Sequence, residues 1–362
     1  MTAAFGEGHN SAARNLALAL EDMGVTVRVE DPCFQGLPVL TPIVSKLYRG
    51  VTTHAPRLWA RIYKSTDQCD FSKERLSFMR KPERALAGVM EEFKPDAVVS
   101  TYPLYPYHLE RIFAADGRRV PIFTAVTDSI EINAAWMNAP TDWWLVTDGA
   151  TRDAMVGEGL DPGRIVDTGF PVHPKLGDLR PLSAEDGCDP FRVLYFPTAK
   201  LPYVRRHSKA LLNADERVTL TIVLGKNVRR LYSRAAEIKR AYPGRVRLVG
   251  WTRRVPEYLS RHHLVVGKAG GATVHESIAA RCPMLIHHLV PGQEEGNLRL
   301  LEQIGGGYLA ETPEKLGARV ADLLADGQAG WRSMKRALAV HGHSLGAVSG
   351  ARFILKNLAE DR

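Results

Sequence analysis

The sequence has few cysteines, no long apolar run and no low-complexity tract, and each absence excludes a class of protein. The four cysteines are scattered, with no pair at the spacing of a zinc or redox motif, so we expect free thiols and a reducing compartment. No apolar run reaches the roughly 18 residues of a membrane-spanning helix. The first residues lack the basic start and apolar core of a signal peptide. A cytoplasmic, globular chain is therefore expected.

The chain is long and basic. With 362 residues, 45% of them hydrophobic, it can bury a large core, and its length predicts two domains. A net charge of +8 and a pI near 9.3 favour an anionic partner. Nucleic acid, anionic lipid and a nucleotide diphosphate all fit that charge, but no nucleic-acid-binding module is recognisable.

Short apolar segments alternate with helix-type patterns along the chain, which predicts parallel, doubly wound α/β sheets. We predict strands over residues 25–30, 96–101, 121–126, 143–146, 164–167, 192–196, 218–224, 246–249, 264–266 and 284–288. Residues 173–190 are rich in turn-forming residues and read as a linker. This divides the chain into an N-terminal domain, 1–172, and a C-terminal domain, 191–345, followed by a last helix over 346–362.

The clearest functional pattern begins at the end of the strand over 264–266. Gly270 and Gly271 let the backbone approach a ligand closely. A helix beginning at Ala272 or Thr273 then offers free N–H groups and a positive dipole end to a phosphate. Glu276 lies one turn further, where a carboxylate can accept two hydrogen bonds from a ribose diol.

A second unit of the same kind follows. The strand over 284–288 leads to a polar loop that carries Gln293, Glu294, Glu295 and Asn297 at the start of another helix. One unit suits a diphosphate and ribose, and the other offers partners for sugar hydroxyls. Together they predict a nucleotide-sugar site.

The N-terminus resembles these strand-loop-helix units but has little sequence for the strand. Gly6 to His9 read as a glycine loop that feeds a helix over 11–23. Such a loop normally follows a strand, yet only five residues precede it. We therefore expect the first strand to be truncated and the natural product to begin upstream.

Residues 32–66 contain no acidic residue, and basic side chains alternate with aromatic and aliphatic ones. Arg57, Trp59 and Arg61 are typical of this stretch. Such a composition suits an anionic membrane surface, where each nearby cation contributes about 1 kcal/mol. A partly buried helix with a solvated basic face explains it equally well.

These motifs together resemble those of the monogalactosyldiacylglycerol synthase and processive diacylglycerol glycosyltransferase family, relatives of the glycosyltransferase that makes lipid II. The resemblance rests on Gly6–Ala13, Leu47–Tyr63, Thr127–Asp128, Gly169–Val172, Gly225–Asn227, Gly267–Glu276 and Pro291–Asn297. The pair formed by the last two motifs is the most specific part.

The resemblance implies a GT-B fold, in which two Rossmann-like domains face each other across a cleft. It implies an enzyme that moves a hexose or N-acetylhexosamine from a UDP-sugar to a lipid, with inversion, diacylglycerol being the expected acceptor. No cofactor is implied beyond the donor. The expected location is the inner face of the cell membrane, as a peripheral protein. A polyprenyl-lipid N-acetylglucosaminyltransferase and a UDP-sugar epimerase are the alternatives.

On the acceptor side, the resemblance implies that His9 takes or orients the proton of the attacking hydroxyl. Asp128 or Glu131 is expected to assist, so the identity of the base stays open. Asn133 stands where the family often has a histidine, and it can only hydrogen-bond. Trp136 is expected beside the acceptor.

On the donor side, the resemblance implies that Lys268 and the glycine pair hold the diphosphate and stabilise the leaving group. It places uracil near Val255. The donor-binding residues expected in all are Gly8, Val255, Lys268, Gly270, Gly271, Thr273, Glu276, Gln293, Glu294 and Asn297. The sequence has no Asp-x-Asp motif, so we expect metal-independent transfer.

Two rival functions are weaker. Residues 342–346, around Ser344, match the G-x-S-x-G elbow of hydrolases, but a helix-like pattern precedes them and no histidine follows. We predict a helix-helix turn there. A catalytically silent nucleotide-sugar-binding protein is also conceivable, although His9, Lys268 and Glu276 are all present.

Overall fold

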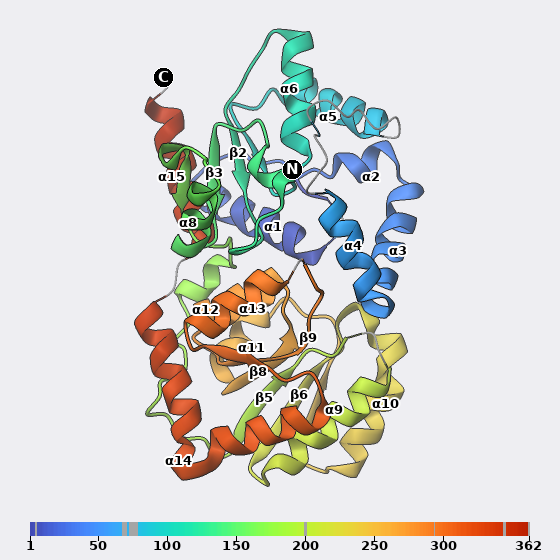
Figure 1. Ribbon diagram of the computed structural model, residues 1–362, viewed down its shortest axis with the longest axis vertical. Coiled ribbons are helices and arrows are strands. Elements are labelled where there is room, and N and C mark those ends of the chain that lie inside the picture. The colour runs from blue at the N-terminus through green and yellow to red at the C-terminus, as the bar shows by residue number, and fades with distance from the viewer. Residues whose placement is uncertain are drawn as a thin grey trace. The chain divides into compact units, whose positions relative to one another are not determined.

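The computed structural model describes residues 1–3, 6–66, 71, 79–198, 201–292, 294–342 and 345–360 (Figure 1). The chain divides into two compact units. The first unit comprises Met1–Pro174, Pro291–Gly296 and Ser344–Arg362, and the second comprises Lys175–Val290 and Asn297–His343. Each unit has its own parallel sheet.

The first unit is built on a parallel sheet in the order β1-β2-β3-β4. Its strands are β1 (Val98–Ser100), β2 (Ile122–Ala125), β3 (Trp143–Val146) and β4 (Ile165–Asp167). Its helices include α1 (Glu7–Asp22), α2 (Pro32–Gly36), α3 (Leu40–His54), α4 (Pro56–Thr66), α5 (Arg80–Phe93), α6 (Tyr105–Asp116), α7 (Ala134–Met137), α8 (Gly149–Gly157) and α15 (Gly346–Glu360).

The strands of this sheet are short and apolar because helices cover both faces. All four residues of β2 are buried. Leu16 of α1 and Ile354 of α15 pack with Phe123 and Leu145 on one face. The last helix of the chain thus belongs to the core of the first unit, and Figure 1 shows it in red beside this sheet.

The first residues of the chain bond as a strand would, although no regular strand is formed. The amino group of Met1 donates to the Val99 carbonyl oxygen at 2.7 Å, and the Thr101 N–H donates to the Met1 oxygen at 3.0 Å. On the other side the Thr2 N–H donates to the Glu30 oxygen at 2.9 Å. Residues 1–3 therefore lie where the first strand was expected.

The second unit has a six-stranded parallel sheet in the order β10-β9-β8-β5-β6-β7. Its strands are β5 (Phe191–Tyr195), β6 (Val218–Val223), β7 (Val246–Val249), β8 (Leu264–Lys268), β9 (Met284–His288) and β10 (Gly307–Leu309). Its helices include α9 (Leu201–Ala214), α10 (Val228–Ala241), α11 (Val255–Arg261), α12 (Gly271–Ala279), α13 (Glu295–Gln303), which begins in the first unit, and α14 (Pro313–His341). Taken in chain order this is the Rossmann arrangement 3-2-1-4-5-6, in which the strand order reverses between β5 and β8.

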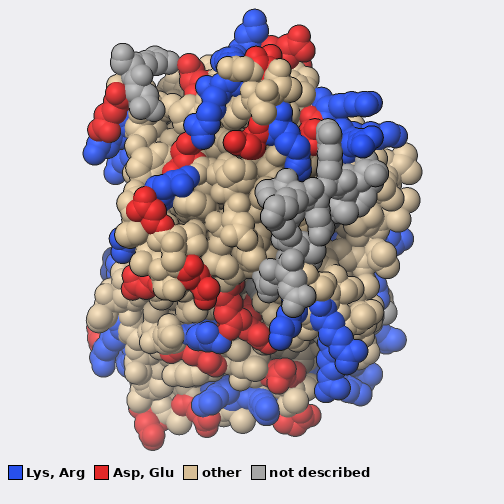
Figure 2. Space-filling model, turned by 45° about the horizontal axis from the view of Figure 1, so that its top comes forward, with Lys and Arg blue, Asp and Glu red and all other residues tan. Residues whose placement is uncertain are grey.

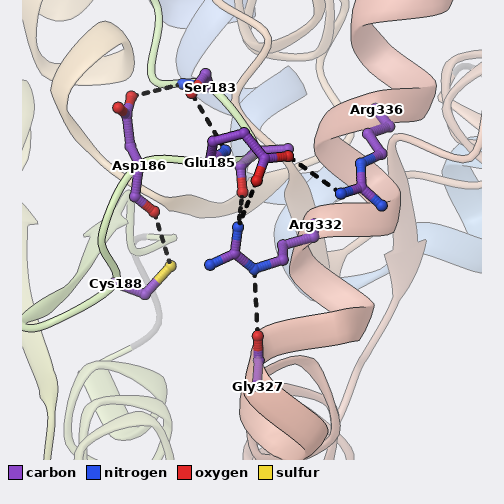
Figure 3. A network of polar contacts seen from close by, with 8 residues as sticks. Ser183, Glu185, Asp186, Cys188, Gly327, Arg332 and Arg336 are labelled. Atoms are coloured by element: carbon purple, nitrogen blue, oxygen red, sulfur yellow. Dashed lines mark hydrogen bonds and ion pairs between the residues drawn. The ribbon is translucent and has the colours of Figure 1, made fainter.

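The linker is fixed to the second unit. Figure 3 shows Glu185 between Arg332 and Arg336 of α14, with nitrogen–oxygen distances of 3.4 and 3.1 Å. Arg332 also donates to the Ala184 carbonyl oxygen. Non-helical dihedral angles over residues 325–328 divide α14 into two helices.

Most predicted strands are present, with two differences. The segment over 25–30 is not a regular strand, since among the described residues a single backbone hydrogen bond joins it to residues 1–3. Strand β10 was missed because Gly307–Leu309 is only three residues long, too short for a periodic signal. Gly342 follows α14 and Gly346 is the first residue of α15, whereas His343 and Ser344 of the predicted helix-helix turn lie outside the described residues.

Candidate active site

The glycine loop after β8 lies at the reversal point of the second sheet, where open α/β sheets bind ligands at the carboxyl ends of their strands. Gly270 is the N-cap of α12, and no side chain caps the first turn. The helix begins at Gly271, one or two residues earlier than predicted. Its first N–H groups and positive dipole end therefore suit an anion, and Lys268 is exposed beside them.

Asn297 stabilises the backbone just before this loop. Its amide nitrogen donates to the Ala269 carbonyl oxygen at 3.1 Å, and its side chain is buried. The Ala269 N–H donates to the His288 oxygen at 3.2 Å, so the loop is held from two sides. Asn297 Oδ1 is buried without a hydrogen-bond partner among the described residues.

The other donor-side residues of the second unit lie on two helices. Thr273 and Glu276 are one turn apart on α12, both half-buried. Val255 is the first residue of α11, after the N-cap Arg254. Thr198 is a further candidate for contact with a phosphate or the acceptor. It follows β5 across the reversal point, and its hydroxyl oxygen is buried without a hydrogen-bond partner among the described residues.

In the first unit, His9 lies in the opening turn of α1, which begins at Glu7. The predicted glycine loop is therefore shorter than expected, and Gly8 is part of the helix. His9 Nδ1 and the Thr127 hydroxyl oxygen are 3.0 Å apart, and the ring lies 5.9 Å from that of Trp136. Burial lowers the pKa of His9 to about 4, so its imidazole is neutral near pH 7.

Asp128 follows Thr127, the hydrogen-bond partner of His9, and its pKa is shifted in the opposite direction to that of His9. Its Oδ2 accepts a hydrogen bond from Trp136 Nε1 at 2.9 Å, and its carboxyl group is buried. Burial raises the pKa of Asp128 to about 6; the indole hydrogen bond opposes this and the charge of Glu294 adds to it. Asp128 is thus a carboxylate whose pKa is close to neutral pH.

Two residues predicted to meet the acceptor have structural roles here. Asn133 caps α7, since its Oδ1 accepts a hydrogen bond from the Ala135 N–H at 3.0 Å. Trp136 is only 2% exposed, and its indole orients Asp128. Contact of either side chain with an acceptor stays a prediction.

The polar loop before α13 packs within the first unit. A Cβ at Gly296 would lie 1.8 Å from the Ser129 carbonyl oxygen, so the two backbones touch there. Ser129 and Glu131 enclose Ile130 in a tight turn with a φ of +59°, a value rare for a β-branched residue. Glu294 is buried, which explains its effect on Asp128, and Gln293 lies outside the described residues.

A cavity of about 510 Å³ lies in the first unit beside this loop. Its walls come from α4, α7, α8, residues 130–133 and the loop itself. The polar or charged residues that line it are Tyr63, Lys64, Glu131, Asn133, Glu158 and Glu295. It can hold the polar part of a ligand.

Helix α3 exposes apolar side chains and buries polar ones. Thr41 and Ser45 are buried, whereas Ile43 and Leu47 are 57% and 65% exposed. The exposed apolar side chains over α3 and α4 are Leu40, Ile43, Val44, Leu47, Leu58 and Ile62, with Val39 just before them. Four of them follow the i, i+3, i+4, i+7 spacing of one helix face.

The three basic-aromatic residues predicted for a membrane surface divide into two groups. Arg57 and Arg61 are exposed, one turn apart on α4. Trp59 instead packs inside the pair of helices, edge-on to Tyr48 with 4.7 Å between ring centroids. Figure 2 shows Lys and Arg in separate groups on the face in view. Within the part of the chain that is described, no helix has both the length and the apolar composition to cross a membrane.

Comparisons with known proteins identify relatives of this chain. Residues 9–172 match the family model of monogalactosyldiacylglycerol (MGDG) synthase. The processive diacylglycerol beta-glucosyltransferase of Bacillus licheniformis is 24% identical over 335 residues, which cover 90% of this chain and 86% of that protein.

Solved structures agree on the fold. MurG of Acinetobacter baumannii matches with a TM-score of 0.55 at 16% identity, over 78% of this chain and 80% of its own. The UDP-GlcNAc 2-epimerase of Neisseria meningitidis, bound to UDP-GlcNAc, matches with a TM-score of 0.55 at 11% identity, over 78% and 81%. The predicted GT-B class, with two Rossmann-like units, is confirmed. The sequence resemblance is confirmed as well, and the chain is related to the monogalactosyldiacylglycerol synthases and processive diacylglycerol glucosyltransferases.

Proposed function

We propose that this protein transfers a hexose or N-acetylhexosamine from a UDP-sugar to a hydroxyl group of a lipid, with diacylglycerol as the acceptor. The observation that carries the proposal is the uncapped start of α12 at the reversal point of the second sheet. The diacylglycerol glucosyltransferase whose sequence matches nine-tenths of this chain supports the acceptor class.

On the donor side, the N–H groups of Gly271 and its neighbours bind the diphosphate, and Lys268 adds a cation. They stabilise the charge that builds on UDP as the bond to the anomeric carbon breaks. Glu276 accepts hydrogen bonds from the ribose hydroxyls. Stabilisation of the leaving group then needs only groups of this chain, without a resident metal.

On the acceptor side, Asp128 takes the proton of the attacking hydroxyl. The oxygen bonds to the anomeric carbon from the face opposite UDP, so the configuration inverts. Asp128 suits this role because its carboxyl group has a pKa of about 6, near the operating pH, and Trp136 fixes its orientation. His9, with a pKa of about 4, is the weaker base, and its ring orients Thr127.

The pH dependence of the reaction follows from this assignment. Asp128 must be deprotonated to accept a proton, and burial raises its pKa to about 6. We expect kcat/KM to be constant above that pH and to fall about tenfold per pH unit below it. A profile measured with a water-soluble acceptor analogue checks this. An acid limb near pH 4 would instead favour His9.

The outward apolar face of α3 supports binding to a membrane surface. Lys46 and Arg49 on α3 and Arg57 and Arg61 on α4 are exposed around it. Apolar side chains enter the interface while the cations meet anionic headgroups. We propose that the protein is peripheral on the inner face of the cell membrane and that the lipid headgroup enters the 510 Å³ cavity beside α4.

Polar substitution on this face is expected to weaken membrane binding. Burial of an aliphatic side chain is worth about 1.5–3 kcal/mol, so Ile43→Asn with Leu47→Asn reduces flotation with phosphatidylglycerol-containing vesicles at least tenfold. The matched control is Val340→Asn, since Val340 is 88% exposed on α14. Equal flotation of all three proteins would show that the α3 face is not the membrane contact.

One experiment tests the transfer itself. The protein is incubated with membrane lipids and a panel of radiolabelled UDP-sugars, and the products are separated by thin-layer chromatography. Label in a glycosyl-diacylglycerol supports the proposal. Label in a polyprenyl lipid supports the alternative acceptor, and conversion of the UDP-sugar without lipid labelling supports an epimerase.

A further inference from the structure

The second unit has a cavity of about 570 Å³ that the donor site does not use. It lies between α11 and the first halves of β5, β6 and β7, whereas the Gly270 loop follows the carboxyl end of β8. Five arginines and one carboxylate line it: Arg192, Arg245, Arg247, Arg254, Arg261 and Glu257. The lining therefore carries an excess of positive charge.

The pairing of the strands places basic residues of the lining on one face of the sheet. Arg192 of β5 pairs with Thr219 of β6, and Thr221 of β6 pairs with Arg247 of β7. Paired residues of parallel strands point to the same face, so these four share one face of the sheet. The residues that alternate with them on β5, β6 and β7 belong to the apolar core on the other face.

Two of the arginines form fixed parts of the wall. Arg192 Nε donates to the Arg261 carbonyl oxygen at 2.7 Å. The Arg245 guanidinium donates to the carbonyl oxygens of Val218, Leu212 and Asp215 at 2.6–2.9 Å. The acceptors of these bonds are neutral carbonyl groups. They therefore do not neutralise the positive charge of either guanidinium group.

The other three arginines are exposed at the mouth. Arg247 lies over the Tyr258 ring at 5.8 Å. Arg254 is 3.7 Å from Glu257, which also accepts a hydrogen bond from Lys175 at 2.8 Å, so two cations share the one carboxylate. Among the described residues, the Arg261 guanidinium has no hydrogen bond or ion pair. Like charges gathered in this way repel one another unless an anion joins them.

We propose that this cavity binds a phosphate-bearing anion, with Arg247 and Arg261 as its main contacts. The planar guanidinium group donates two parallel hydrogen bonds to a phosphate, and a phosphate ester or a phospholipid headgroup fits the volume. The wall also contains the Thr221 hydroxyl group, whose oxygen is 2.9 Å from His262 Nε2. The site is separate from the donor loop, so the proposal does not depend on the proposed function.

Calorimetry with inorganic pyrophosphate tests it, with the full chain saturated with UDP so that the donor site is filled. We expect wild-type protein to bind pyrophosphate and the Arg247→Gln/Arg261→Gln variant to bind at least about tenfold more weakly. The matched control is Lys239→Gln/Arg240→Gln, which removes the same charge from exposed positions of α10 and is expected to bind like wild type. Arg261→Gln alone provides a second cavity variant if the double variant unfolds.

No pyrophosphate binding by wild type, or equal binding by wild type and the cavity variants, would overturn the proposal. If UDP itself does not bind, the proposed function fails, and the same titration without UDP still compares the variants. Flotation with phosphatidylcholine vesicles, with and without phosphatidylglycerol, then separates the sources. Loss of phosphatidylglycerol-dependent flotation in the cavity variant identifies a lipid headgroup, and unchanged flotation identifies a free phosphate compound.

Discussion

Asp128→Asn is expected to lower kcat about a hundredfold to ten-thousandfold while UDP affinity stays unchanged. The carboxylate is the group we propose to take the acceptor proton, and an amide cannot do so. The substitution preserves shape, and an amide oxygen still accepts the hydrogen bond from Trp136 Nε1. The fold is therefore retained, and the loss reports on chemistry. Steady-state rates and calorimetry with UDP check both parts.

His9 provides the comparison for this experiment. Its imidazole is neutral near pH 7, and its proposed task is to orient Thr127. His9→Gln keeps a side chain that can hydrogen-bond, so it should retain more activity than Asp128→Asn. A reversed order, with Asp128→Asn active and His9→Gln inactive, would make His9 the base.

Glu276→Ala is expected to weaken UDP binding about tenfold to a hundredfold, because hydrogen bonds to a charged group are worth about 1.5–3 kcal/mol. The side chain is half-buried on α12, one turn beyond Thr273 at the start of that helix. Glu302→Ala, at an exposed position of α13, is the matched control for the loss of one negative charge. Calorimetry with UDP measures both variants.

The same titration with uridine sharpens this test. Uridine has the ribose but no diphosphate, so its affinity should depend on Glu276 but not on Lys268. Equal UDP affinity of Glu276→Ala and wild type would remove Glu276 from the ribose site. It would leave the diphosphate assignment at Gly270 and Gly271 intact.

The sequence alone determined the local elements of both sheets. Strands β3 and β7 begin and end at the predicted residues. Each is a run of four residues that is apolar throughout or alternates between apolar and polar, and turn-forming residues flank it on both sides. The glycine pair after β8 likewise predicted the start of α12 to within two residues. Such features depend on neighbours along the chain, which a sequence displays directly.

Only the tertiary structure decided which side chains meet. The contact of Gly296 with Ser129 brings the loop of Glu294 into the first unit, where the charge of Glu294 raises the pKa of Asp128. Its contact with sugar hydroxyls stays a prediction. Trp59 was predicted to face the membrane, but it packs against Tyr48 inside the α3–α4 pair. These contacts join residues far apart in sequence or on different helices, so no local pattern predicts them.

The choice between Asp128 and His9 shows the same limit. An unperturbed aspartate carboxyl group has a pKa of about 3.9 and a histidine imidazole one of about 6.5. The sequence left the base open between them. Burial moves the pKa of the carboxyl group up and that of the imidazole down, because low polarity disfavours whichever form is charged. The sequence determined which groups are present, and their burial in the folded first unit decided the direction in which each pKa moves.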